Sequence, residues 1–502
     1  MAIERIVIVG GGTAGWMAAA ALSRLSDSRK VAITLIESEQ IGTVGVGEAT
    51  IPPMVEFNQL LGIDEREMMA ATQATFKLGI QFANWGNLGE SYLHPFGTYG
   101  YHIGGIAFHQ VWHRARAEGD RRPLQVFNLE TVAAHFGRFS RTQDYQRDDL
   151  PPMNYAYHID ATRYAAFLRG YSEKRGVVRR EGKVVDTTLD GETGYVSSVT
   201  MDDGATVEGD LFIDCSGFRG LLIEQALETG YEDWRQYLPC DRAVALPCRR
   251  EDGSPPPPFT KAIAHTAGWQ WQVPLQHRNG NGHVYCSEYM SDEEAHDILV
   301  ANMMGKPEAE PNFLRFVTGR RKKSWNRNVV ALGLSSGFME PLESTSIHLI
   351  NSGINRLIAI LSLDGVTQTQ QDTFNRLTDK EYRRIRDFLV LHYNATTRDD
   401  SPFWDYVRTM DVPDTLTEKI ELFKANGQIF REEDELFNET SWAAVMMGQG
   451  IAMGGHGPIA ASMDLPDFRG ELDEMERSIR YLVNHMPTHG DYLAKYCPAK
   501  AA

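Results

Sequence analysis

Residues 6–15, Ile-Val-Ile-Val-Gly-Gly-Gly-Thr-Ala-Gly, decide the fold of this chain. Gly10, Gly12 and Gly15 occupy the glycine places of a G-x-G-x-x-G fingerprint, between an apolar strand and an Ala-rich helix over 16–25. The first glycine permits a tight turn, the second lets a pyrophosphate approach the backbone, and the third allows close helix–strand packing. The spacing predicts a βαβ unit that places a dinucleotide phosphate at the helix N-terminus, beside Thr13 and Ala14.

A second apolar strand over 31–37 ends at Glu37, where a carboxylate can accept a hydrogen bond from a ribose hydroxyl. An acid at this position favours an unphosphorylated ribose, and therefore FAD or NAD. FAD is preferred because Leu211–Gly217 is a buried strand ending in Asp214-x-x-Gly, similar to the strand that closes over the adenosine half of FAD in two-domain flavoproteins. The alternative for this second segment is another core strand.

Length and composition agree with a large globular enzyme. The chain has 502 residues, 42% hydrophobic and 23% charged, which is material for two or three domains. Alternating runs over 242–290 predict a β-rich region, and beyond residue 344 the pattern is mainly helical. We therefore predict an α/β fold with residues 1–360 as a Rossmann-like FAD-binding box carrying an inserted β-rich substrate-side region, and residues 361–502 as a mainly helical cap.

Charge and cysteine usage exclude several classes of protein. A net charge of −17 argues against a nucleic acid or an anionic membrane as partner. No uninterrupted apolar run of about 18 residues is present, the N-terminus does not resemble a signal peptide, and the five cysteines show no CxxC spacing. We expect a cytoplasmic protein, either a monomer or a homodimer. His109 and His113 are spaced for one helix face, but no third ligand accompanies them, so no metal site is expected.

Several rare strings carry a family resemblance. Gly268-Trp269-Gln270-Trp271-Gln272-Val273-Pro274 resembles the Gly-Trp-x-Trp-x-Ile-Pro signature of flavin-dependent halogenases, with valine where isoleucine is usual. GGGTAGWMAA at the start, GVGEATIP at 45–52, DLFIDCSGFRGLLI at 210–223 and LGLSSGFMEPLEST at 332–345 agree as well. The chain is identified as a member of the tryptophan-halogenase-like family. The resemblance implies that the segment with Trp269 and Trp271 keeps the substrate away from the flavin, although both could be ordinary strand packing.

The resemblance also implies the catalytic residues. Lys77 matches the family lysine that receives hypohalous acid, whereas an arbitrary lysine in its alternating strand would lie on a solvated face. Glu343 matches the acid that stabilises the charged ring and accepts its proton, and otherwise would be a plain first-turn acid. Pro341 and Ser344 are start signals for an apolar helix, so the amides near Thr345 and Ser346 would bind chloride or bromide. The family usually has glycine in place of Ser346.

Other cofactor and substrate residues follow from the same matches. The segment 45–52 would be the strap beside the flavin, and the further cofactor candidates are Glu48, Ala49, Val184, Gly333, Leu334 and Ile347. Leu334 is informative because related aromatic hydroxylases have an aspartate there. The absence of a second nucleotide fingerprint predicts that reduced FAD arrives by diffusion from a separate flavin reductase.

The expected substrate is an electron-rich aromatic, either indole or an indole-containing compound. His94, Phe96 and Ser344 match the family's pocket, and Phe437 falls in place of one member of its Phe-Trp pair. No tyrosine lies between residues 407 and 436, so the tyrosine clamp that holds the amino-acid group of free tryptophan is incomplete. Two rival functions remain: a flavin-dependent aromatic hydroxylase, which would oxidise NAD(P)H alone and ignore bromide, and a flavin- or indole-binding protein without turnover.

Overall fold

The computed structural model describes residues 2–25, 31–41, 47–145, 152–250, 254–462 and 465–499. The predicted βαβ unit is confirmed: β1 pairs in parallel with β2 on one side and β12 on the other, and α1 (Thr13–Leu25) connects β1 to β2. The strands of this sheet are, in spatial order, β21 (Trp325–Asn326), β22 (Val329–Ala331), β12 (Leu211–Asp214), β1 (Arg5–Val9), β2 (Ala32–Glu37) and β8 (Val178–Glu181). β1 is buried along four of its five residues, as expected of a central parallel strand.

A larger, mainly antiparallel sheet forms the β-rich region predicted for the middle of the chain. Its strands are β19 (Asn312–Arg315), β14 (Arg242–Ala245), β18 (Arg278–Tyr285), β17 (Gly268–Pro274), β16 (Thr260–His265), β5 (Gly79–Ala83) and β6 (Ser91–Pro95), with β15 (Cys248–Arg249) beside β18. Long-range pairing builds this sheet, because β5 comes from the first hundred residues and pairs in parallel with β16.

Three small sheets complete the strands. The first comprises β3 (Gly47–Ala49), β7 (Ala156–Asp160) and β4 (Thr75–Lys77). The second comprises β9 (Val184–Leu189), β10 (Val196–Met201) and β11 (Thr206–Glu208), and the third β13 (Tyr231–Asp233), β20 (Gly319–Arg321) and β23 (Gly337–Phe338). β4 and β5 are separated by Leu78 alone but belong to different sheets, so the chain passes from one sheet to the other directly after Lys77.

Helices surround the sheets. Those between α1 and residue 346 are α2 (Pro53–Leu60), α3 (Glu65–Thr72), α4 (Phe108–Ala117), α5 (Leu129–His135), α6 (Ala161–Glu173) and α7 (Asp292–Ala301). Asp160 caps α6, its side chain accepting from the Arg163 amide. After residue 346 the elements are α8 (Ser346–Ile360), α9 (Gln368–Asn394), α10 (Pro402–Thr409), α11 (Asp414–Asn426), α12 (Glu439–Gly448), α13 (Pro458–Ser462), α14 (Leu465–His485) and α15 (His489–Tyr496).

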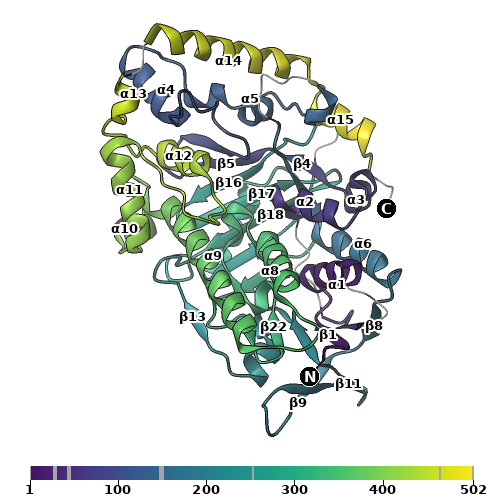
Figure 1. Ribbon diagram of the computed structural model, residues 1–502. Coiled ribbons are helices and arrows are strands. Elements are labelled where there is room, and N and C mark those ends of the chain that lie inside the picture. The colour runs from purple at the N-terminus through teal and green to yellow at the C-terminus, as the bar shows by residue number, and fades with distance from the viewer. Residues whose placement is uncertain are drawn as a thin grey trace.

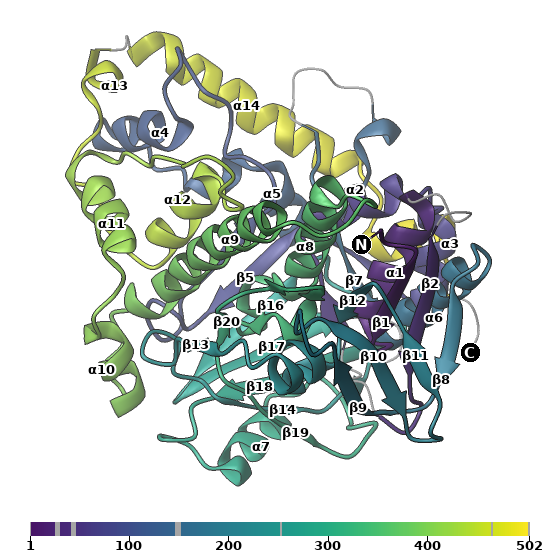
Figure 2. The ribbon, with the colours of Figure 1, turned by 60° about the horizontal axis from the view of Figure 1, so that its bottom comes forward.

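Two long helices connect the halves of the molecule. α8 packs against both α1 and α9, and α9 lies along the large sheet, with its apolar face in the same buried cluster as Trp269 and Trp271 (Figure 2). Helices α10 to α13 gather on the side of the molecule away from α1 and β1 (Figure 1). No helix in the described part of the chain is both long enough and apolar enough to cross a bilayer.

Candidate functional site

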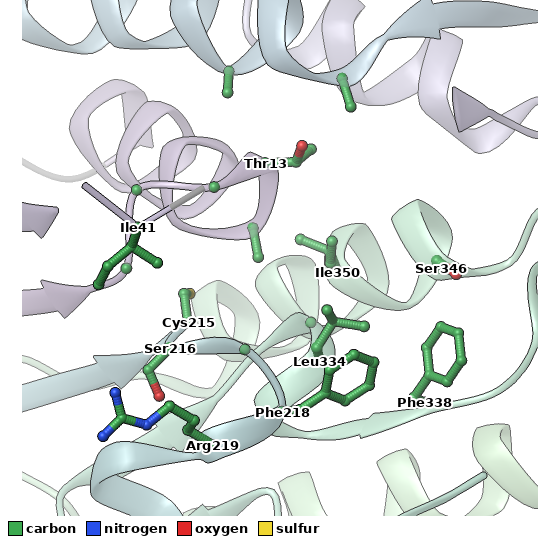
Figure 3. Close-up of a pocket in the computed structure, with 18 of the residues that line it drawn as sticks. Thr13, Ile41, Cys215, Ser216, Phe218, Arg219, Leu334, Phe338, Ser346 and Ile350 are labelled. Carbon is green, nitrogen blue, oxygen red and sulfur yellow. The ribbon is translucent and has the colours of Figure 1, made fainter. Parts of the chain in front are cut away.

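A cavity of about 1290 Å³ runs from the fingerprint glycines at the end of β1 to the N-terminus of α8. It is lined by Thr13 at the start of α1, by Leu334 just before α8 and by Ser346 at the start of α8. Cys215 and Ser216 line it from the segment after β12 (Figure 3). The predicted cofactor residues that line it are Gly10, Gly12, Thr13, Ala14, Glu37, Glu48, Ala49, Val184, Gly333, Leu334 and Ile347. Residues 42–46, which include the first part of the predicted strap, lie outside the described residues.

The fingerprint has the geometry that a pyrophosphate requires. Gly10 has φ +112°, and a Cβ there would lie 2.2 Å from the Cys215 carbonyl oxygen. A Cβ at Gly15 would lie 1.8 Å from the Gly10 carbonyl oxygen, so this glycine permits the close packing of helix and strand. Apart from its neighbours in the chain, no atom of the described segments lies within 4 Å of where a Cβ would stand at Gly12. The open space above that backbone and the helix N-terminus beside it fit a dinucleotide phosphate.

Glu37, the last residue of β2, lines the cavity. Its Oε2 accepts from the indole N–H of Trp16 at 3.2 Å, and its Oε1 pairs with Arg179, with Arg169 3.7 Å away. These partners orient the carboxylate beside Gly11, whose added Cβ would lie 1.6 Å from Glu37 Oε2.

Asp214 differs from its predicted role as a cofactor contact. Its side chain is fully buried, and its carboxylate accepts from the backbone amides of Ser216, Leu222 and Ile223. The residue therefore holds the turn that follows β12, and Cys215 and Ser216, next in the chain, line the cavity in its place. The sequence placed the acid on the correct strand but could not show on which side its carboxylate would lie.

The two tryptophans of the rare string line the cavity from β17. Trp271 lies opposite Gly282 of β18, where a Cβ would come within 2.0 Å of the indole, so a glycine is needed across from it. The Trp269 indole donates to Oε2 of Glu340 at 2.7 Å, and the Tyr393 hydroxyl donates to the same oxygen at 2.6 Å. Burial raises the pKa of Glu340 to about 7. Glu340 was not anticipated from the sequence, where it reads as one of two acids flanking Pro341.

Lys77 is completely buried at the end of β4. Its Nζ donates to the Thr50 carbonyl oxygen at 3.0 Å and to Ser344 Oγ at 2.8 Å, and lies 5.0 Å from the centre of the Phe96 ring. Burial lowers the pKa of Lys77 to about 7, although attraction to Glu343 opposes the fall. The lysine can therefore gain or lose a proton near neutral pH.

The strand that carries Lys77 is fixed by α15. The Phe76 amide donates to Nε2 of His489 at 3.2 Å, and Nδ1 of that imidazole lies 2.8 Å from the Pro256 carbonyl oxygen. Because Nε2 accepts, the imidazole is neutral, and burial lowers the pKa of His489 to about 4. The backbone beside Lys77 thus depends on a residue more than 400 positions further along the chain.

Glu343 lies between two histidines. His94 Nδ1 is 2.9 and 3.0 Å from the two carboxylate oxygens, and His392 Nε2 is 2.8 Å from Oε1. Burial raises the pKa of Glu343, but attraction to His94 and hydrogen bonding with both imidazoles outweigh it and bring the pKa to about 2. His392 was missed in the sequence. The available signal was a histidine four residues after Phe388 on an otherwise apolar helix face.

The start of α8 lies next to Glu343. The helix begins at Ser346 rather than at the predicted Ser344, because residues 341–343 form a 3-10 turn and Ser344 has φ +60°. Thr345 is the N-terminal cap residue and is fully buried, and its Oγ1 has no hydrogen-bond partner among the residues that the structure describes. A free hydroxyl and free amides at a helix N-terminus fit a small anion.

An aromatic wall closes the far side of His94 and Glu343. Phe437 stacks on Phe388 with ring centres 3.8 Å apart, and Trp442 contacts Phe388 edge-on. His94 lies within about 6 Å of both phenylalanine rings. Together with Phe96 beside Lys77, these rings make the surroundings of Lys77 and Glu343 strongly aromatic and apolar.

No group of three or more His, Cys, Asp or Glu side chains among the described residues could hold a metal ion. His109 and His113 lie on α4, where the His109 imidazole is 2.7 Å from the Gly427 carbonyl oxygen.

Comparisons with known proteins agree with this geometry. The family model of tryptophan halogenases matches residues 5–465. The chain is 35% identical to tryptophan 6-halogenase SttH of Streptomyces toxytricini, covering 98% of each chain. Among solved structures, Xcc4156, a flavin-dependent halogenase from Xanthomonas campestris, is 45% identical, covers 100% of both chains and gives a TM-score of 0.96. BrvH, a flavin-dependent halogenase from Brevundimonas sp. BAL3, is 44% identical over 99% of both chains with a TM-score of 0.94.

Proposed function

Because the chain belongs to the tryptophan halogenase family and is a flavin-dependent halogenase, we propose that it uses bromide or chloride to halogenate indole or an indole-containing compound. The observation that carries the proposal is that a buried lysine and a buried, ionised glutamate lie among aromatic rings, next to Ser344, which lines the cavity that carries the dinucleotide fingerprint.

FAD is the group that this cavity would hold. The fingerprint backbone of 10–14 would bind the pyrophosphate, Glu37 the ribose, and Leu334 and Ile347 the flavin end of the cavity. Reduced FAD, when bound, supplies with oxygen the oxidising equivalents that turn halide into hypohalous acid. A separate flavin reductase would deliver it, since the sequence has one dinucleotide fingerprint.

The halide site is proposed at Thr345 and Ser346. The free Oγ1 of Thr345 and the amides at the start of α8 are donors at the positive end of a helix dipole. Ser346 lines the cavity, so a halide there would lie at the flavin side of Glu343.

Lys77 would receive hypohalous acid and present the halogen to the substrate. A buried ammonium with a pKa of about 7 can donate a proton to the departing oxygen, which leaves as water. Ser344 and the Thr50 carbonyl hold Nζ in place for that transfer. A lysine with its ordinary pKa would hold its proton too tightly at neutral pH.

Glu343 would accept the proton that leaves the halogenated carbon. Its carboxylate is ionised throughout the working pH range and stabilises positive charge on the ring before the proton is lost. Phe96 and Phe437 would align the ring, and His94 would support Glu343. The residues beside Glu343 are aromatic rings, and the sequence lacks the tyrosine clamp, which favours indole or a larger indole compound over free tryptophan.

Turnover measured by mass spectrometry tests this function. The enzyme is supplied with FAD, a flavin reductase, NADH, oxygen and indole, in bromide, in chloride and without halide. We expect a halogen-shifted product that disappears in Lys77→Ala and persists in Lys174→Ala, a change at an exposed lysine outside the site. An oxygenated product formed without halide would instead support the hydroxylase, and FAD binding without any product would support a binding protein.

A further inference from the structure

Glu340 is a buried acid that the proposed reaction does not use. Its side chain is fully buried, and the next residue, Pro341, begins the turn that carries Glu343. Oε2 accepts from the Trp269 indole N–H of β17 and from the Tyr393 hydroxyl of α9, whereas Oε1 has no partner among the described residues. This carboxyl therefore holds both side chains through a single oxygen.

The Trp269 indole meets this acid with its nitrogen and the cavity with other atoms. Trp269 lines the cavity that carries the dinucleotide fingerprint but is only 1% exposed, and Glu340 is not among the residues that line it. Since the nitrogen points to Glu340, the adjoining C2 atom of the same ring is held on that side as well. The rings of Trp85 and Trp271 pack against the indole at 6.4 and 6.2 Å between centres.

The nitrogen-containing ring of an indole is its most reactive part toward hypohalous acid. The halogen bonds to a ring carbon, the hydrogen of that carbon leaves as a proton, and the oxygen leaves as water, so no further reactant is needed. An enzyme that makes this acid beside its own tryptophans therefore exposes them to halogenation. Trp16 lines the same cavity, is also 1% exposed and likewise donates its indole N–H to a carboxylate, that of Glu37, at 3.2 Å.

We propose that Glu340 is a positioning residue that keeps the nitrogen edge of Trp269 turned away from the cavity and so protects it from the hypohalous acid that the enzyme makes. The inference rests on the proposed function for the source of that acid. Without an acceptor at Oε2 the buried indole N–H would have no partner, which is strongly disfavoured. The ring would then turn toward the cavity that it borders, where the N–H can bond to water.

Modification by reagent hypobromous acid tests this role without turnover. The full chain is treated with small portions of the reagent, and the tryptic peptide of residues 262–278, which contains Trp269, is analysed by mass spectrometry. We expect Glu340→Leu to raise the bromination of Trp269 about tenfold or more, as expected for the loss of one buried hydrogen bond. Glu340→Gln, which keeps an acceptor oxygen, should restore the wild-type level. Trp16, which keeps its own carboxylate, should stay unmodified in every variant.

Tyr393→Phe is the matched control, because it removes the other donor to Oε2 and leaves the bond to Trp269. Trp269 should remain as unreactive in this variant as in the wild type. Equal protection of Trp269 in Glu340→Leu and in the wild type would show that packing alone holds the ring, and would overturn the proposal. So would equal bromination of Trp16 and Trp269 in Glu340→Leu, which would show a general loosening of the cavity.

Turnover with indole separates this inference from the proposed function. Glu340→Leu should lose activity over successive cycles and gain halogen on Trp269. A variant that makes halogenated indole while its Trp269 stays intact would overturn the protective role. The expected pattern with reagent acid, in an enzyme that makes no halogenated product even as wild type, would refute the proposed function and leave the role of Glu340 in orienting Trp269 intact.

Discussion

Replacing Lys77 by methionine should abolish halogenation and change the stability of the protein in a pH-dependent way. The lysine is completely buried, and burial lowers its pKa from the ordinary 10.5 to about 7. That fall of about 3.5 pH units, at about 1.4 kcal/mol each, means that the folded state loses about 5 kcal/mol by burying this ammonium at low pH. Methionine has a similar shape and carries no charge, so this cost disappears in Lys77→Met.

The sign of the pH dependence follows from proton counts. Below pH 7 the lysine is protonated in both states, and the full cost is present. Between pH 7 and 10.5 the unfolded chain holds a proton that the folded protein lacks, so the wild type gains stability as pH rises. The advantage of Lys77→Met should therefore be constant below pH 7 and shrink by about 1.4 kcal/mol for each pH unit above it.

Thermal unfolding of the cofactor-free proteins measures this difference. The entropy of unfolding is about 2.1 cal/mol/K per residue, so in a chain of 502 residues each kcal/mol of unfolding free energy shifts the Tm by about 1 °C. The Thr50 carbonyl and the Ser344 hydroxyl lose a donor in the variant, at about 1 to 3 kcal/mol each. That loss is the same at every pH. The decisive quantity is therefore how much the Tm difference between Lys77→Met and the wild type changes from pH 7 to pH 9, and we expect it to shrink by about 2 to 3 °C. Lys174→Met, at an exposed position, is the control, and a Tm difference for Lys77→Met that stays constant with pH would refute the reasoning.

Four other substitutions test the same site. Gly10→Ala should lower the Tm because its Cβ would collide with the Cys215 carbonyl oxygen. Gly12→Ala should leave the Tm unchanged but weaken FAD binding at least about tenfold, as measured by fluorescence titration. An unchanged FAD affinity in Gly12→Ala would contradict the phosphate site. Glu343→Gln should reduce the single-turnover rate of halogenation by roughly 10² to 10⁴ with unchanged FAD affinity, and a loss below tenfold would exclude a proton-accepting role. Glu340→Gln should raise the Tm at pH 8 but not at pH 5. Burial raises the pKa of Glu340 from 4.5 to about 7, so the wild type loses stability as the pH rises through that range. Equal Tm shifts at both pH values would show that Glu340 is not protonated in the folded protein at pH 5.

Local patterns were sufficient to predict the framework of the cofactor cavity. The strand, glycine turn and helix of residues 5–25 depend on interactions within a few residues of each other, and the structure confirms them. Asp160 was likewise predictable as a cap because its partner, the Arg163 amide, lies three residues away. Interactions between residues so close in the chain can be predicted from the local sequence alone.

The candidate site could not be built in the same way. Alternation around Lys77 suggested that one side of its strand would be buried, but both sides are, because β4 pairs with β7 while β5 pairs with β16 in a different sheet. The contact of His392 with Glu343 depends on how α9 is rotated above the large sheet. Family motifs identified Lys77 and Glu343 as candidates, whereas their partners depend on long-range packing that no short pattern records.

The hydrogen bond from the Phe76 amide to His489 spans 413 positions in the chain. At about 5 to 20 residues per second, a ribosome needs roughly 20 to 80 s to proceed from one to the other. Throughout that interval the nascent chain already contains its lysine but lacks the imidazole that holds the neighbouring backbone. The backbone beside Lys77 is therefore held in place only late in translation, so the growing polypeptide passes most of its synthesis without the assembled site that we propose for hypohalous acid.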